Sequence, residues 1–244
     1  MASSARRYQQ EMHESIGFFA TWLPGDLLEL GDTGVLKEGR FRKSNSLRNL
    51  GITYRTSKLG APQNLQYTSK GGTNVSFDGG ADGLSSVSIS GSIKVEFSSA
   101  GSFLFHASNV RNTRLENDAS LTEQILAAWR SNKWQKDWYL VESIHEADCA
   151  TIIVSEDVAA AITFSARGPA AAVPLADPKV NLSVSSSRGK MVQIIAGRKL
   201  QPLYSLSRVR EGWFTEPSVE PVRGGGGRQS SIFVRTGISE LLES

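Results

Sequence analysis

The stretch VSISGSIKVEF, residues 87–97, alternates apolar and polar side chains almost without interruption. A period of two is that of a β-strand, whose successive side chains point to opposite faces. Eleven residues at about 3.3 Å each span roughly 35 Å, which exceeds most strands and is close to what a bilayer requires. We therefore predict a long strand whose apolar face is made by Val87, Ile89, Ile93, Val95 and Phe97.

A second alternating region follows later in the chain. Its apolar side chains occupy even positions over residues 152–166, and the Arg-Gly-Pro sequence at 167–169 ends the run. The predicted partner of the first strand runs through residues 65–77, with a turn at 78–83. The chain is thus predicted to hold two long β-hairpin regions. The second contributes to its apolar faces Val158, Ile162, Phe164, Val180, Leu182 and Val184.

Helical spacing of apolar residues predicts two short helices, at residues 4–20 and 117–130. Between the first helix and the first hairpin region, glycines punctuate residues 26–55, which predicts short strands and turns. Trp134 and Trp138 are expected to anchor a core or an interface. The predicted fold class is α+β, a twisted and mainly antiparallel sheet with flanking short helices.

The composition is that of a globular protein. The chain has 244 residues, of which 39% are hydrophobic and 21% are charged. A glycine run at 224–227 predicts a linker, so we expect one domain at 1–222 and a linker with a short tail at 223–244. Cys149 is the one cysteine, which favours a reducing compartment. With no signal peptide and no apolar run of 18 residues, we expect a cytoplasmic protein without a transmembrane helix.

The charge is small but unevenly distributed. The formal net charge is +3, with basic residues concentrated at 37–58 and 188–210 and acidic residues at 116–157. Such polarity steers a protein toward an anionic surface, either phospholipid or nucleic acid. A nucleic-acid site needs aromatic side chains interleaved with Arg and Lys. The serine-rich strands carry few aromatic residues, so we predict no nucleic-acid partner.

The sequence gives little support to an enzyme. His145 and Cys149 share one face of a predicted strand but lie about 13 Å apart, which is too far for a nucleophile and its base. The glycine runs lack the Lys-Ser/Thr of a phosphate-binding loop. The acidic turn at 78–83 lacks the downstream glutamate of a calcium loop. We therefore predict no catalytic residues, no metal site and no cofactor.

The alternation itself has two interpretations. A soluble antiparallel sheet also alternates, so one candidate is a soluble β-sandwich that binds a ligand or a protein and never enters a membrane. The other follows from the length of the runs and from polar faces of Ser, Thr and Asn with few charges. Such strands fit a membrane on one face and water on the other. Unpaired strand edges are costly in hydrocarbon, so a pore would have to be an oligomer whose strands close a transmembrane β-barrel between subunits.

The order of these segments resembles the gasdermin pore-forming domain, which begins with a basic amphipathic helix and places two extendable hairpins around a helical middle. The sequence WYLVESI at 138–144 resembles the family's strand leading into the second hairpin, and LQPLYSL at 200–206 resembles the strand that follows it. The resemblance covers roughly residues 5–210. It is nearest to the short fungal gasdermins that regulate cell death.

The resemblance implies a gasdermin N-domain-like fold and a defined activity. The protein would bind acidic phospholipids, oligomerise and insert its hairpins, so that it permeabilises the plasma membrane in a pyroptosis-like programmed cell death. In the fungal type, activation follows contact with an allelic gasdermin-like partner, as in allorecognition and heterokaryon incompatibility. The protein would be cytoplasmic while inactive and at the plasma membrane once assembled, as a homo-oligomer or hetero-oligomer.

The resemblance also implies lipid-binding residues. Arg6 and Arg7 match the first helix of the family by position. Each basic group near an anionic surface contributes about 1 kcal/mol, so several must act together. Phe18, Phe19 and Trp22 fit either a membrane interface or a protein core. The early basic loop of the family is matched by Lys37, Arg40, Arg42 and Lys43.

Overall fold

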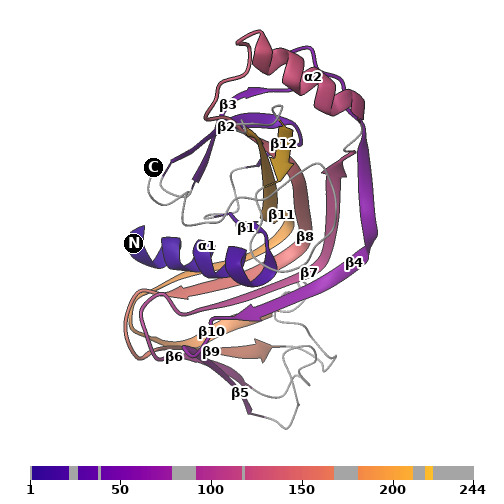
Figure 1. Cartoon of the computed structure of the whole chain (residues 1–244). Coiled ribbons are helices and arrows are strands. Elements are labelled where there is room, and N and C mark those ends of the chain that lie inside the picture. Colours follow the sequence, from indigo (N-terminus) through magenta and orange to yellow (C-terminus); the bar gives the residue numbers. More distant parts are fainter. Residues whose placement is uncertain are drawn as a thin grey trace. The chain divides into compact units, whose positions relative to one another are not determined.

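The structure is a computed structural model that describes residues 2–21, 27–37, 40–78, 92–116, 119–167, 181–210 and 218–221. These residues form two helices and 12 strands, and the strand pairings given below are all antiparallel (Figure 1). The prediction of an α+β chain with mainly antiparallel pairing and short helices is confirmed. Among the described residues, neither helix has the length and apolarity that crossing a membrane would take.

The chain divides into two compact units. The first, the hairpin unit, contains Met1–Tyr8, Pro62–Val110 and Glu146–Pro202, and the second, the α2 unit, contains Gln9–Ala61, Arg111–His145 and Leu203–Ser244. The division falls within helix α1 and four long strands. Their bounds are Ala2–Ile16 for α1, Thr56–Thr68 for β4, Phe103–Leu115 for β7, Tyr139–Ser155 for β8 and Met191–Arg210 for β11. The predicted tail at 223–244 lies outside the described residues.

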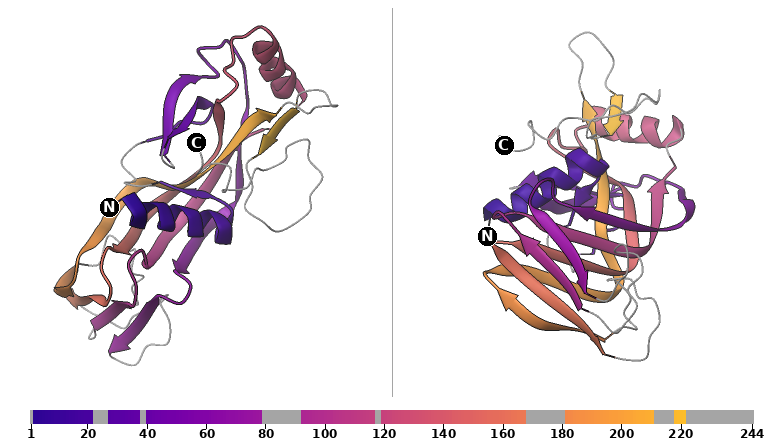
Figure 2. Two further views of the ribbon diagram at one scale, coloured as in Figure 1. Left: turned by 60° about the vertical axis from the view of Figure 1, so that its left-hand side comes forward. Right: turned by 90° about the horizontal axis from the view of Figure 1, so that it is seen from below.

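A four-stranded sheet forms the centre of the hairpin unit. Its strands are β5 (Thr73–Asp78), β6 (Ser92–Phe97), β9 (Ala160–Arg167) and β10 (Asn181–Arg188), in the order β10-β9-β6-β5 (Figures 1 and 2). Alternate side chains of β6 and β9 point into one apolar core, as period two requires. Leu104 of β7 and Ile153 of β8 belong to the same core. The residues that β6 and β9 contribute are Ile93, Val95, Phe97, Ala160, Ile162 and Phe164.

The predicted hairpin regions need two corrections at turns. The run expected at 65–77 is broken, because β4 ends at Thr68 and β5 begins at Thr73. The run expected at 152–166 is also broken, because β8 ends at Ser155 and β9 begins at Ala160. In this second turn the Ser155 hydroxyl donates to the carbonyl of Asp157 at 2.6 Å, and Ala159 has a φ of 59°. Four residues separate the two strands. Because this number is even, apolar side chains stay on even positions on both sides of the turn, and the sequence pattern does not reveal it.

The α2 unit contains short strands, helix α2 and the part of α1 from Gln9 to Ile16. Strands β1 (Phe19–Ala20), β2 (Asp32–Lys37), β3 (Arg40–Ser46) and β12 (Ser218–Pro221) join parts of β8 and β11. Phe19 pairs with Tyr204, and β2 pairs with both β3 and β8. The β2–β3 register shifts at Gly34, where a Cβ would lie 1.9 Å from the carbonyl oxygen of Arg42. This approach explains why a glycine occupies the position.

The helices match their predictions closely in place. Helix α2 (Ala119–Arg130) buries Leu121, Ile125 and Ala128 in a core that includes Trp134 and Trp138, so the predicted anchoring role of the tryptophans is confirmed. The first helix was predicted at 4–20 but ends at Ile16. Gly17 follows with a φ of 78°, and its amide donates to the carbonyl of His13 at 2.9 Å. A left-handed glycine at this place is a common helix terminator.

Candidate functional site

The two hairpins lie side by side in one sheet. Strand β6 pairs with β9, so that Ser92 faces Ser165 at one end and Phe97 faces Ala160 at the other. In the outer pairs, Asp78 faces Ser92 and Asn181 faces Arg167. The segments 79–91 and 168–180, which connect the strands of each hairpin, therefore both join the sheet at the same end. Sequence reasoning found both hairpin regions but gave no sign of this adjacency.

The sheet has one apolar and one polar face. Ile93, Val95 and Phe97 are almost fully buried on the first face. On the second face, the Nζ of Lys94 lies 2.6 Å from Oε1 of Glu96, and this contact lowers the pKa of the Glu96 carboxyl. The Ser185 hydroxyl donates to the carbonyl of Thr163 at 3.1 Å. The polar face thus carries small hydroxyl groups and an exposed ion pair, whose net stabilisation is small, and Asn74 and Arg188 also act on Glu96.

The residues predicted to insert into a membrane have different positions in this form. Val184 lies on the edge strand β10 and is 43% exposed. Val158 lies in the β8–β9 turn and is 71% exposed, so its predicted place in a strand is wrong. Leu182 belongs to β10, whereas Val87, Ile89 and Val180 lie outside the described residues. The remaining predicted residues form the buried core, namely Ile93, Val95, Phe97, Ile162 and Phe164.

The predicted lipid-binding residues of the first segment divide between surface and core. Arg6 and Arg7 are exposed on α1, and Nη1 of Arg7 donates to the carbonyl of Ala100 at 2.9 Å. Phe19 is buried, with its ring centroid 4.2 Å from that of His13 and 5.5 Å from that of Tyr204. Phe19 was expected either at a membrane interface or in a protein core, and in this form of the chain it lies in the core. Trp22 lies outside the described residues.

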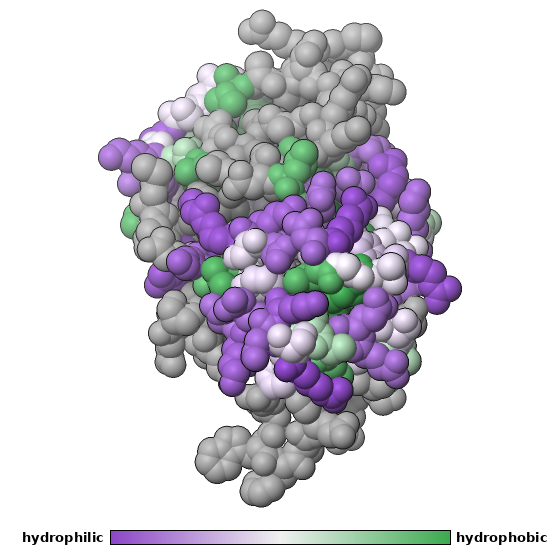
Figure 3. Space-filling model, turned by 90° about the horizontal axis from the view of Figure 1, so that it is seen from above, coloured by the Kyte–Doolittle hydropathy of each residue, from purple (hydrophilic) through white to green (hydrophobic). Residues whose placement is uncertain are grey.

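The predicted basic loop is a β-hairpin. Lys37 ends β2 and pairs with Arg40, which begins β3, and the exposed residues here also include Arg42 and Lys43. Nζ of Lys43 lies 2.7 Å from Oδ1 of Asp32, whose hydrogen bond raises the pKa of this lysine. Lys43 is thus held by an acid within the α2 unit. On the face seen from above, the described residues are mainly hydrophilic, with hydrophobic side chains scattered among them (Figure 3).

All three histidines are buried. Burial lowers the pKa of His106 to about 4, and it also lowers the pKa of His145 to about 4 against the opposing effect of the Leu203 backbone. His13 is fully buried beside Phe19. Cys149 is buried, and its Sγ lies 3.2 Å from the hydroxyl of Ser108. Within the described ranges, no group of three or more His, Cys, Asp or Glu is placed to hold a metal ion.

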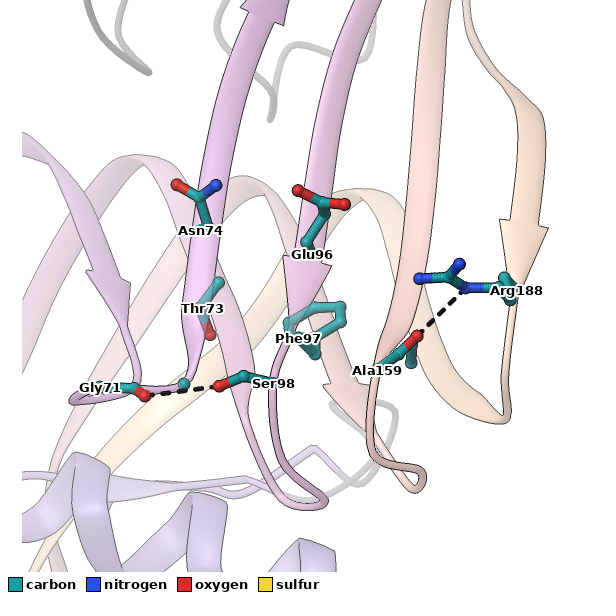
Figure 4. Close-up of a pocket in the computed structure, with 10 residues that line it drawn as sticks. Gly71, Thr73, Asn74, Glu96, Phe97, Ser98, Ala159 and Arg188 are labelled. Carbon is teal, nitrogen blue, oxygen red and sulfur yellow. Dashed lines mark hydrogen bonds between the residues drawn. The ribbon is translucent and has the colours of Figure 1, made fainter.

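A pocket opens where the hairpins meet the rest of the unit, at the end opposite the connecting segments. Its volume is about 310 Å³, and Arg188 and Glu96 stand on two of its sides (Figure 4). Nε of Arg188 donates to the carbonyl of Ala159 at 3.2 Å. Sequence reasoning missed this end of the sheet, where Asp157 also accepts a hydrogen bond from the amide of Lys190 at 2.8 Å. The pairing of Arg188 with an acceptor 29 residues earlier leaves no sequence signal.

Comparisons with known proteins found a likeness among solved structures. No family model matches the chain, and no curated protein matches it. Among solved structures, the cryo-EM structure of the gasdermin A3 membrane pore aligns with 74% of this chain and 72% of its own, at 11% sequence identity and a TM-score of 0.26. At this identity and TM-score, the assignment of a function depends on the geometry of the chain's own residues.

Proposed function

We propose that this chain is a membrane pore-forming protein that binds acidic phospholipids, oligomerises and inserts its two hairpins. The observation that carries the proposal is the four-stranded sheet β10-β9-β6-β5. It places two hairpins next to each other, with both connecting segments at one end. A sheet that alternates apolar and polar side chains in this way is suited to lipid on one face and water on the other.

The same sheet indicates how insertion would proceed. The apolar face now packs on Leu104 and Ile153, and in a membrane it would contact hydrocarbon instead. The serine-rich face would line water. Strands β10 and β5 are the edges of the sheet, and their backbone groups need partners in a lipid environment. Neighbouring copies would supply these partners, so oligomerisation and insertion are coupled.

Attraction to the membrane would come from exposed basic residues. Lys37, Arg40 and Arg42 lie on the β2–β3 hairpin, and Arg6 and Arg7 lie on α1. Each basic group near an anionic surface contributes about 1 kcal/mol, so a single group does not suffice and several on the same unit must act together. Lys43, which pairs with Asp32, contributes less.

The biological setting is proposed from the resemblance to the fungal gasdermins. In that setting the chain stays in the cytoplasm until it meets an allelic gasdermin-like partner. It then assembles at the plasma membrane, alone or with that partner, and causes regulated cell death in allorecognition. This part of the proposal is tested by co-expression of allelic forms with a viability readout.

Dye release from vesicles tests the central proposal. The purified chain, with an allelic partner where one is required, should release dye from vesicles that contain phosphatidylserine. Release should be much weaker from vesicles of phosphatidylcholine alone, because the attraction is electrostatic. Electron microscopy of the same vesicles should show rings. Binding without release from any anionic vesicle would contradict pore formation.

A soluble binding module is the second candidate. The pocket of about 310 Å³ beside Arg188 and Glu96 is the observation that favours it. In that case the chain should bind a small ligand or protein without entering membranes. A chain that remains monomeric on vesicles, with the β6–β9 core still protected from hydrogen exchange, would support this alternative.

A further inference from the structure

A tight turn closes the base of the first hairpin. It spans residues 98–102 between β6 and β7 and is hydrogen-bonded to the β4–β5 turn and to the end of β8. The amide of Ser98 donates to the carbonyl of Gly72, just before β5, at 2.9 Å. The amide of Gly101 donates to the carbonyl of Ser155 at 2.8 Å, and the amide of Ser155 donates to the carbonyl of Ser102 at 2.8 Å. The turn thus ties the base of the β5–β6 hairpin to the end of β8.

The turn leaves little room for change. The hydroxyls of Ser99 and Ser102 lie 2.8 Å apart. A Cβ on Gly72 would lie 2.1 Å from Oγ of Ser102, and Gly101 has a φ of 82° that side chains rarely adopt. A turn with such close contacts is held in one conformation as long as its hydrogen bonds persist.

Arg7 lies across this turn. Its Nη1 donates to the carbonyl of Ala100 at 2.9 Å, and its Cδ lies 2.7 Å from the position that a Cβ on Gly101 would take. The next residue, Tyr8, is fully buried with its ring edge-on to Phe103 at 4.8 Å between centroids. Tyr8 therefore anchors the helix beside the turn, and Arg7 holds the turn from the solvent side.

We propose that Arg7 is a latch that couples membrane contact to release of the first hairpin. In the resting chain its guanidinium holds the 98–102 turn through the Ala100 carbonyl. At an anionic membrane, a lipid phosphate takes the guanidinium in place of that carbonyl, and the base of the β5–β6 hairpin is freed. This inference rests on the proposed function and adds the step by which lipid contact reaches the hairpin.

The exchange of partners follows from hydrogen-bond strengths. Arg7 is exposed, so a phosphate can reach it without unfolding the chain. A phosphate adds a full negative charge and can accept two parallel bonds from a guanidinium, whereas the neutral Ala100 carbonyl accepts a single one from Nη1. The membrane therefore competes favourably for the side chain. The neighbouring Arg6 is also exposed and carries the same charge, which makes it the matched control.

Hydrogen exchange tests the latch without any membrane. Arg7→Ala should speed amide exchange at Gly101 and Ser155 by about three- to tenfold, the effect of losing one hydrogen bond that stabilises the turn. Arg6→Ala should change these rates less than twofold. Protection of Ile125 in α2 should be unchanged in both variants, which shows that they are folded. Equal rates at Gly101 in the two variants would overturn the proposal.

A double-mutant cycle checks that the contact itself is responsible. Gly101→Ala keeps every charge, places a methyl group against Arg7 and strains the left-handed backbone at this position, so it should displace the Arg7 side chain and by itself speed exchange in the turn. Arg7→Ala should then add little to the exchange rate in the Gly101→Ala background. If Arg7→Ala accelerates exchange equally in both backgrounds, Arg7 does not act through this turn, and the latch is wrong.

Vesicles complete the test and separate it from pore formation. Vesicles with phosphatidylserine should speed exchange at Gly101 in the natural chain but add no further acceleration in Arg7→Ala, when the two are compared at equal amounts of vesicle-bound protein. A natural chain that pellets with these vesicles and keeps its slow exchange at Gly101 would overturn the coupling. Faster exchange without dye release would support the latch and contradict the pore.

Discussion

At the scale of single residues, the chain has two exposed valines, one in a strand of the four-stranded sheet and the other in a turn. Val184 lies on β10 and faces Phe164 in the register of the sheet, whereas Val158 lies in the β8–β9 turn. Both are exposed, so both tolerate a charge in the resting chain. By contrast, Ile93 is buried, and a carboxylate there would cost several kcal/mol by burial alone. The valines are therefore the better probes of insertion.

We expect Val184→Asp to lower dye release at least about tenfold, because a carboxylate would face lipid in the inserted sheet. The free energy of unfolding should change by less than about 1 kcal/mol, as is usual for exposed positions. Val158→Asp is the matched control and should leave dye release unchanged. The two variants should be compared at equal amounts of vesicle-bound protein. An equal loss of dye release in both would contradict the proposal that the apolar face of the sheet contacts lipid.

Sequence patterns predict well which face of a strand a residue occupies, but they predict the positions of turns poorly. The assignment of Ile93, Val95 and Phe97 to one apolar face is confirmed, because period two is dictated by the strand backbone. Val158 was misplaced because a four-residue turn keeps its neighbours in phase. The partner of Arg7 could not be foreseen at all, since Ala100 lies 93 residues away and offers only a backbone carbonyl.

At the scale of elements, the β2–β3 hairpin is the strongest candidate for membrane attraction. We expect Arg40→Glu with Arg42→Glu to reduce pelleting with phosphatidylserine vesicles at least about tenfold, since each basic group contributes about 1 kcal/mol and reversal adds repulsion. Arg130→Glu with Lys133→Glu, at the exposed end of α2, makes the same change in net charge. An equal loss of pelleting in both double variants would indicate that binding depends on the net charge of the chain rather than on this hairpin.

The edge strand β10 shows why the resting chain need not polymerise. Its register shifts between Val184 and Ser186, which marks a β-bulge. A bulge twists an edge and disrupts the regular row of backbone donors and acceptors that another strand would need. The presence of two short helices was readable from local sequence, but a bulge depends on the neighbouring strand, so no local pattern predicts it.

At the scale of the whole molecule, acid should weaken the fold. The pKa values of His106 and His145 are lowered by burial to about 4 from 6.5. The unfolded chain therefore binds more protons between these values, so stability falls as the pH drops from about 6.5 toward 4. Each histidine contributes up to about 3 kcal/mol to this loss.

Thermal unfolding between pH 7 and pH 4.5 would measure the effect. His106→Phe and His145→Phe keep an aromatic ring but remove the titrating group. Each variant should show a shallower fall in Tm with pH than the natural chain. The burial of neutral imidazoles would be contradicted if the Tm of the natural chain were constant over this pH range. It would also be contradicted if the Tm of both variants fell with pH as steeply as that of the natural chain.

The adjacency of the hairpins is the feature that sequence could not supply. The two hairpins are separated along the chain by β7, α2 and β8, and the pairing of β6 with β9 brings them together. Pairing between strands that are far apart in the sequence depends on the packing of the whole fold and not on local sequence. The sequence predicted which residues form hairpins, and the structure adds that the hairpins are neighbours.

The shared register of β6 and β9 has a mechanical consequence. Because Ser92 stays opposite Ser165 and both connecting segments leave at one end, the four strands can advance as a single ribbon along their own axes. No strand must cross another, and no backbone bond between the hairpins must break. In the proposed insertion, the work of activation then falls on separating the ribbon from Leu104 and Ile153 and on releasing the bonds of the 98–102 turn.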